Sequence, residues 1–144
     1  MKKLLGLLAI LALATTPAFA DKTVKAGPRK GRILEMEKQN AEFFVEKDRT
    51  ISIAFYDAAG KQQPAGDQVI TATAEAPKGK AKLEFEKKGD LLVSKTPLPE
   101  GEGYQVVVQA QAGADAKPKN FLIKLLTHNC GGCNHAEYAC TCDE

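Results

Sequence analysis

The chain has 144 residues, with 20 lysines and arginines against 18 aspartates and glutamates. The near balance of charge, with lysines interleaved among glutamates, provides no dense basic face, so neither nucleic acid nor an anionic membrane surface is expected as a partner. The length suits one domain, which can bury about two thirds of its unfolded surface without covalent help.

The first twenty residues have the composition of a secretory signal peptide. Two lysines precede an uncharged apolar run at residues 4–13, and residues 18–20 form an A-x-A cleavage signal. The run is too short for a comfortable permanent anchor, and no second long apolar stretch follows it. We therefore expect cleavage at about Ala20 and a soluble periplasmic or secreted protein without stable membrane insertion. An uncleaved short anchor is the alternative.

Residues 21–126 predict an irregular arm followed by an all-β domain. Residues 21–31 combine lysine, glycine and proline, which is typical of a solvated N-terminal arm. Beyond them, short segments of β-type composition are separated by glycine, proline or aspartate, and none of adequate length has helical periodicity. The predicted strands are residues 32–36, 41–46, 50–56, 68–75, 80–86, 91–95, 104–110 and 120–126.

Alternation of apolar and polar residues predicts which side chains face the core. Residues two apart on a strand share a face, so the apolar members of each alternating set are expected to point inward together. The sets are Ile51, Ile53 and Phe55; Leu83 and Phe85; Tyr104, Val106 and Val108; and Phe121, Ile123 and Leu125.

Tyr104 follows a segment rich in proline and glycine, residues 97–103. In immunoglobulin-like and fibronectin-type sandwiches, a tyrosine near the start of the sixth strand bonds its hydroxyl to upstream backbone at a corner. Tyr104 is either such a residue or one more half-buried aromatic. With seven to eight short strands, an immunoglobulin-like Greek-key sandwich over residues 32–126 is the most economical architecture, and a small closed barrel is the alternative.

The predicted sandwich contains no recognisable catalytic arrangement. Asp57, Asp67 and Asp90 lie at predicted turns, where aspartate caps and solvates the chain. Ser52 and Ser94 lie within strands, and neither has a G-x-S-x-G setting. We expect no enzymatic activity.

Residues 127–144 form an irregular Cys/His-rich tail that holds all four cysteines and both histidines of the chain. The cysteine spacing is C-x2-C-x6-C-x-C, in which two pairs are joined by a short loop. Four thiolates can surround Zn²⁺ tetrahedrally, and soft thiolates also select Cu(I). The candidate metal ligands are Cys130, Cys133, Cys140 and Cys142, with His128 and His135 as optional ligands.

Other residues of the tail support this interpretation. Gly131 and Gly132 are expected to let the backbone fold tightly between the first two cysteines. Tyr138 is expected to pack the tail onto the edge of the sandwich. Asp143 and Glu144 add negative charge, which favours a cation weakly.

Two other uses of the cysteines stay open. Exported cysteines in an even number tend to pair as disulfides. Such bonds would begin and end within one short segment, however, so they would add little to the sandwich. The C-G-G-C sequence also has the C-x-x-C form of thiol redox proteins, but those place it in a thioredoxin-like βαβ unit, which this chain does not predict.

Residues 27–61 contain the run G-P-R-K-G-R-I-L-E-M … F-F-V-E … I-S-I-A-F-Y-D-A-A-G-K. This run resembles the opening of small periplasmic β-sandwich domains associated with heavy-metal efflux adaptors of Gram-negative bacteria. The resemblance implies a periplasmic, metal-handling setting, with a metal efflux or delivery protein as partner. Those domains often have a histidine just before the glycines, where this chain has Arg29 and Lys30, so no N-terminal metal site is expected.

The sequence therefore predicts an exported, soluble, metal-binding protein that sequesters or delivers copper or zinc through its tail. The alternative is a structural or protein-interaction β-sandwich module whose tail is closed by two disulfides.

Overall fold

The structure is a computed structural model that describes residues 24–142. The predicted signal peptide, together with Asp143 and Glu144, lies outside the described residues. Over residues 24–142, none of the helical segments is long and apolar enough to cross a membrane.

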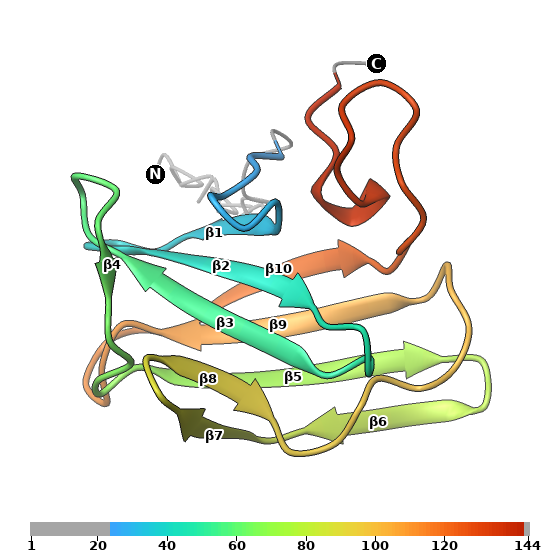
Figure 1. The fold of residues 1–144 in the computed structure, drawn as a ribbon. Helices are drawn as coiled ribbons and strands as arrows, with labels where there is room; N and C mark the ends of the chain where they lie inside the picture. The colour runs from blue at the N-terminus through green and yellow to red at the C-terminus, as the bar shows by residue number, and fades with distance from the viewer. Residues whose placement is uncertain (1–23, 143–144) are drawn as a thin grey trace, which may run out of the picture.

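Within the described residues, ten strands form two antiparallel sheets that enclose a hydrophobic core (Figure 1). The strands of the first sheet are β1 (Arg32–Glu35), β2 (Asn40–Val45), β3 (Ile51–Tyr56), β4 (Gln62–Gln63), β7 (Phe85–Lys88) and β8 (Leu91–Ser94). Those of the second sheet are β5 (Val69–Ala76), β6 (Gly79–Leu83), β9 (Gln105–Gln111) and β10 (Lys119–Lys124). One 3-10 turn, η1 (Glu137–Ala139), lies in the tail.

The strand order is that of an immunoglobulin-like Greek-key sandwich. The first sheet has the order β1-β2-β3-β8-β7, with β4 paired to β3, and the second has the order β10-β9-β5-β6. In immunoglobulin nomenclature, β2, β3, β8 and β7 correspond to strands A, B, E and D, and β10, β9, β5 and β6 correspond to G, F, C and C′. The predicted all-β sandwich fold is confirmed.

The main difference from the predicted strands concerns residues 80–86. This segment is two strands, β6 and β7, which belong to different sheets and are separated by Glu84. Leu83, in β6 of the second sheet, is buried in the core. Phe85, in β7 of the first sheet, packs against the same core. Together with the short β4, this division raises the strand number from the predicted seven or eight to ten. The other predicted strands agree with the structure to within two residues at each end.

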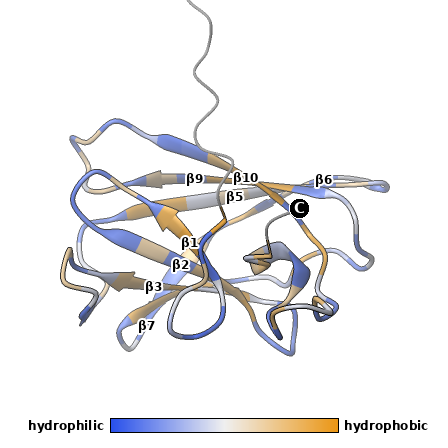
Figure 2. Cartoon of the chain, turned by 90° about the horizontal axis from the view of Figure 1, so that it is seen from above, coloured by the Kyte–Doolittle hydropathy of each residue, from blue (hydrophilic) through white to orange (hydrophobic). Residues whose placement is uncertain are grey.

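Side chains from both sheets fill the core. Hydrophobic residues are found along the strands in Figure 2, whereas many residues of the connecting loops are hydrophilic. No cysteine belongs to the core of the described chain. Since each fully buried aliphatic or aromatic side chain stabilises a fold by about 1.5–3 kcal/mol, the sandwich derives its stability without the sulfurs. The predicted inward-facing residues that are buried are Ile51, Ile53, Phe55, Leu83, Tyr104, Val106, Val108, Ile123 and Leu125.

Tyr104 forms the predicted corner at the entry to β9. Its hydroxyl donates a hydrogen bond to the Pro99 carbonyl at 2.6 Å. The Arg49 guanidinium crosses from the β2–β3 turn and donates to the same carbonyl at 2.6 Å and to that of Gly101 at 2.8 Å. The tyrosine-corner interpretation is thereby confirmed, and Arg49 ties the corner to the opposite sheet.

Residues 25–31 form an ordered turn on the outer face of the first sheet, above the fully buried Glu42. Glu42 Oε1 accepts the backbone N–H groups of Arg29 at 2.9 Å and Gly31 at 2.8 Å, and its Oε2 accepts the Tyr56 hydroxyl at 2.6 Å. A Cβ at Gly27 would lie 2.4 Å from the Glu42 carboxyl carbon. The buried carboxylate is therefore satisfied by a turn that needs glycine to approach it.

The Arg29 side chain has a structural role in this turn. Its guanidinium donates to Ser52 Oγ and Glu46 Oε1, each at 2.8 Å, and lies 4.7 Å from the centre of the Phe44 ring. Arg29 is thus a cation that is bound to a carboxylate and a hydroxyl.

Candidate metal centre

The tail leaves β10 and folds back on itself beside β1 and β2 (Figure 1). Residues 129 and 136 form an isolated antiparallel bridge. Inside it, the Cys130 N–H donates to the His135 carbonyl at 2.8 Å, and outside it, the Glu137 N–H donates to the His128 carbonyl at 2.9 Å. These bonds close a narrow loop that contains the C-G-G-C sequence.

Tyr138 fixes the tail to the sandwich, as the sequence predicted. The residue is 5% exposed, and its ring meets that of Phe43 edge-to-face with centroids 5.6 Å apart. Its hydroxyl accepts the Val45 N–H at 3.1 Å, and its own N–H donates to the Leu126 carbonyl at 3.1 Å. Ala139, which follows in η1, is fully buried in the same core. The segment between the two cysteine pairs is therefore part of the folded domain.

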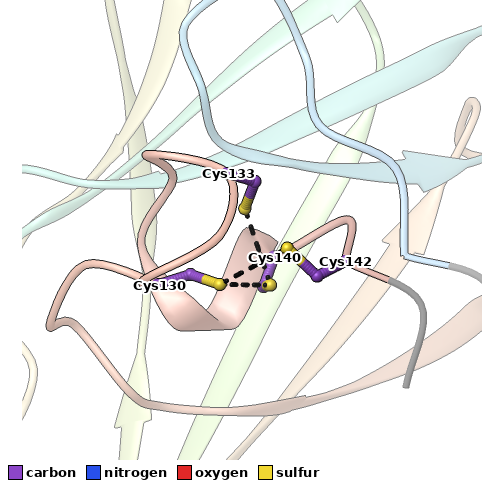
Figure 3. A group of neighbouring side chains, drawn as sticks. All are labelled: Cys130, Cys133, Cys140 and Cys142. Atoms are coloured by element: carbon purple, nitrogen blue, oxygen red, sulfur yellow. Dashed lines mark hydrogen bonds between the residues drawn. The ribbon is translucent and has the colours of Figure 1, made fainter.

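The four cysteine sulfurs lie together in one group (Figure 3), with every Sγ within 4.8 Å of the others. Cys130 Sγ is 2.8 Å from Cys140 Sγ and 3.7 Å from Cys142 Sγ. Cys133 Sγ is 3.5 Å from Cys140 Sγ. Two ligands come from the loop after β10 and two from the segment after η1, so the fold of the tail brings both cysteine pairs to one point.

The spacing of the sulfurs is compatible with a single tetrahedral ion. With Zn–S bonds near 2.3 Å, the sulfurs of a tetrahedral site are about 3.8 Å apart. The Cys133–Cys140 and Cys130–Cys142 separations of 3.5 and 3.7 Å are close to that value. The Cys130–Cys140 contact of 2.8 Å would have to open by about 1 Å. The group can hold a metal ion, and its thiolates suit both Zn²⁺ and Cu(I).

The sulfurs are free thiols in the structure. Their shortest separation, 2.8 Å, exceeds the S–S bond length of about 2.05 Å, so no pair has the geometry of a disulfide. Residues 125–129 connect β10 to the C-G-G-C sequence, and the described tail contains only the short η1, so the helix N-terminus used by thioredoxin-like proteins does not accompany this sequence.

The two glycines of the C-G-G-C sequence differ in their surroundings. A Cβ at Gly132 would lie 2.6 Å from Cys142 Sγ, whereas a Cβ at Gly131 would have nothing within 4 Å. Neither glycine has a positive φ, and the left-handed residue of the loop is Asn134, with φ 59°. Gly132 is therefore required for the close approach of Cys142, and Asn134 provides the reversal of the chain.

The sulfurs differ in their hydrogen bonds. Backbone N–H groups of Thr141 and His135 donate to Cys133 Sγ and lower the pKa of this thiol to about 5. A hydrogen bond with Cys130 is the main cause that raises the pKa of Cys140 to about 12. The group therefore favours one thiolate, at Cys133, supported by neighbouring donors before any ion binds.

Neither histidine belongs to the four-sulfur group. His128 Nδ1 lies 3.4 Å from Glu102 Oε2, and Glu102 also accepts both the N–H and the hydroxyl of the preceding Thr127. His135 lies beside Cys133, because both its N–H and its side chain interact with the Cys133 sulfur, and its carbonyl accepts the Cys130 N–H at 2.8 Å. Its Nδ1 is buried without a hydrogen-bond partner in the described chain.

Sequence reasoning missed three participants: the Thr141 N–H beside Cys133, the contact of Gly132 with Cys142, and the Val45 N–H that holds Tyr138. The first two had a signal in the chain, because backbone next to ligand cysteines commonly supplies N–H groups to sulfur and glycine permits close approach. The third joins residues 93 positions apart and had no local signal.

Comparison of the chain with family models, curated proteins and solved structures found no match, so the case for a metal centre depends on the geometry of the four thiols themselves.

Proposed function

We propose that this chain is an exported protein that binds one copper(I) or zinc ion through its tail and sequesters the ion or delivers it. The ligands would be Cys130, Cys133, Cys140 and Cys142. The supporting observation is that their four Sγ atoms converge to within 4.8 Å of one another while remaining unbonded. Four thiolates at this spacing supply a complete ligand set for a soft or borderline ion.

The position of the group supports cargo binding over a purely structural role for the metal. The sandwich core contains no cysteine, and the half-buried and exposed sulfurs lie outside it. An ion there stabilises the tail and is accessible to exchange. The signal-peptide composition of residues 1–20 supports export, and the resemblance of residues 27–61 to efflux-associated domains supports a metal efflux or delivery protein as the recipient.

Native mass spectrometry of the mature protein recovered from the periplasm tests the proposal. We expect one retained copper or zinc ion per chain and free thiols once the ion is removed. A variant with all four cysteines replaced by serine is the matched control, because it keeps the cysteine-free core but loses the soft ligands. A mass four hydrogen atoms below that of the reduced chain, with no metal and no free thiol, would favour the disulfide-closed module. Recovery of the uncleaved chain in the cytoplasm would contradict export.

A further inference from the structure

The four sulfurs are not equivalent in their access to solvent. Cys142 is exposed, whereas Cys130, Cys133 and Cys140 are intermediate in burial. Cys142 Sγ lies against Gly132, and both Gly132 and its neighbour Gly131 are exposed. Since glycine has no side chain, this approach to the sulfur group is uncovered on the Cys142 side.

The sulfurs also differ in how firmly the backbone holds them. Cys140 directly follows η1, whose Ala139 is fully buried, and the Cys140 N–H donates to the Glu137 carbonyl at 3.1 Å. The Cys130 backbone is fixed by its hydrogen bond to the His135 carbonyl. The hydrogen bonds that bear on Cys142 Sγ involve other cysteine sulfurs, first Cys130. A bound ion would compete for these sulfur–sulfur contacts, but it would leave the backbone N–H bonds in place.

We propose that Cys142 is the exchange ligand of the centre, through which the ion passes to a thiol-bearing acceptor. This inference depends on the proposed metal-binding function. The acceptor thiol loses its proton as its sulfur bonds to the ion; the bond from the ion to Cys142 Sγ breaks, and Cys142 takes up a proton. No electrons are transferred, and Cys130, Cys133 and Cys140 hold the ion during the exchange. The acceptor thiol belongs either to a cysteine-containing protein or to a small thiol.

Limited alkylation of the loaded protein tests the assignment. The mature chain is loaded with one equivalent of Zn²⁺, and native mass spectrometry verifies the ratio of one ion per chain. It is then treated with substoichiometric iodoacetamide, and the modified cysteine is identified by peptide mapping. We expect a several-fold excess of label on Cys142 among singly modified chains that still retain zinc. First modification at Cys130, Cys133 or Cys140, or simultaneous modification of all four, would overturn the proposal.

Two matched variants provide a second test. Cys142→Ser should retain one zinc ion through the remaining three thiolates and transfer it to an acceptor several-fold faster than the unaltered chain. Cys133→Ser, which removes one of the three sulfurs that hold the ion during the exchange, should lose most of the ion on desalting. Equal retention and equal transfer by the two variants would contradict a special role of Cys142.

The transfer assay is run with glutathione and, separately, with a C-x-x-C peptide, so that it distinguishes a small-thiol acceptor from a protein acceptor. Faster zinc transfer in the presence of either thiol supports the exchange mechanism and identifies the class of acceptor. Transfer rates that depend on neither thiol would overturn it. If native mass spectrometry shows that the unaltered chain retains no ion, the metal-binding function itself fails. That result differs from a chain that retains zinc but is alkylated first at another cysteine.

Discussion

Replacement of Gly132 by alanine should remove Cys142 from the metal centre, whereas the same change at Gly131 should have little effect. The added Cβ at residue 132 would lie 2.6 Å from Cys142 Sγ. At residue 131, the added Cβ would have nothing within 4 Å. Neither position has a positive φ, so an alanine is not strained by the backbone at either site.

The size of the displacement follows from the contact distance. An ordinary contact begins at 3.4 Å, so Cys142 Sγ has to retreat by at least 0.8 Å from its 2.6 Å position. Metal–ligand distances in a working site vary by only about 0.2 Å. Unless the other three sulfurs move with it, a displacement four times as large breaks the bond from Cys142 Sγ to the ion. Loss of an outer partner of a ligand already weakens metal affinity by roughly 10–100-fold, and loss of a ligand should cost no less.

Competition with a chromophoric chelator measures this loss for zinc. We expect the dissociation constant of Gly132→Ala to rise by at least about tenfold, equivalent to about 1.4 kcal/mol, while Gly131→Ala stays close to the unaltered chain. Cobalt(II) substitution provides an independent count of sulfurs, because the intensity of sulfur-to-metal charge-transfer absorption falls when a thiolate is lost. Gly132→Ala with unaltered affinity and a four-thiolate cobalt spectrum would refute the reasoning, as would equal losses in the two variants.

Three further predictions concern the sandwich and its connection to the tail. Tyr138→Ala should lower the unfolding free energy by about 3–5 kcal/mol and also weaken zinc binding, because η1 loses its anchor; denaturant titration and chelator competition measure the two effects. Tyr104→Phe should lower the unfolding free energy by about 1 kcal/mol and leave zinc affinity unchanged, so a matching loss of affinity would contradict the separation of the corner from the metal centre. Hydrogen bonds from Thr127 hold the pKa of Glu102 below its usual 4.5, so its stabilising contribution is complete above about pH 4.5 and is lost as pH falls through the lower folded pKa. Glu102→Gln should remove that part of the decrease in unfolding free energy at acid pH, measured by denaturant titrations at a series of pH values. An unaltered pH dependence would show that the hydrogen bonds between Thr127 and Glu102 do not stabilise the fold.

Much of the fold was predictable because several strands contain large apolar residues at every second position. Ile51, Ile53 and Phe55 are separated by the small residues Ser52 and Ala54, so the period of two was visible in the sequence. The division at Glu84 was not, because Leu83 and Phe85 keep the same period although they belong to different sheets. Local pattern reports which side of a strand is apolar, whereas the choice of partner strand depends on contacts far away in the chain.

The metal centre was predictable in its ligands but not in its geometry. The cysteine spacing indicated that two pairs would meet, and they do. The different environments of Gly131 and Gly132 depend on the path of residues 134–142 back over the loop, which no spacing rule determines. Likewise, the ordered turn over Glu42 is not predictable from the sequence, because a lysine- and glycine-rich segment is typical of a solvated arm and gives no indication of a buried carboxylate on a distant strand.

The attachment of Tyr138 explains how an exposed group of thiols can be arranged before an ion arrives. Cys133 and Cys140 flank a segment whose Tyr138 and Ala139 are buried in the core, so the fold of the sandwich fixes the distance between the two cysteine pairs. Ordering a residue costs about 1–2 kcal/mol of backbone entropy, and here the cost is met largely by burial of η1 rather than by the metal. Metal binding and the docking of Tyr138 are therefore coupled. An ion that binds only the ordered tail must also stabilise the contact of Tyr138 with the core. Removal of the metal should therefore increase hydrogen exchange at the Val45 N–H, which donates to the Tyr138 hydroxyl, more than at the cysteine-free core strand β5.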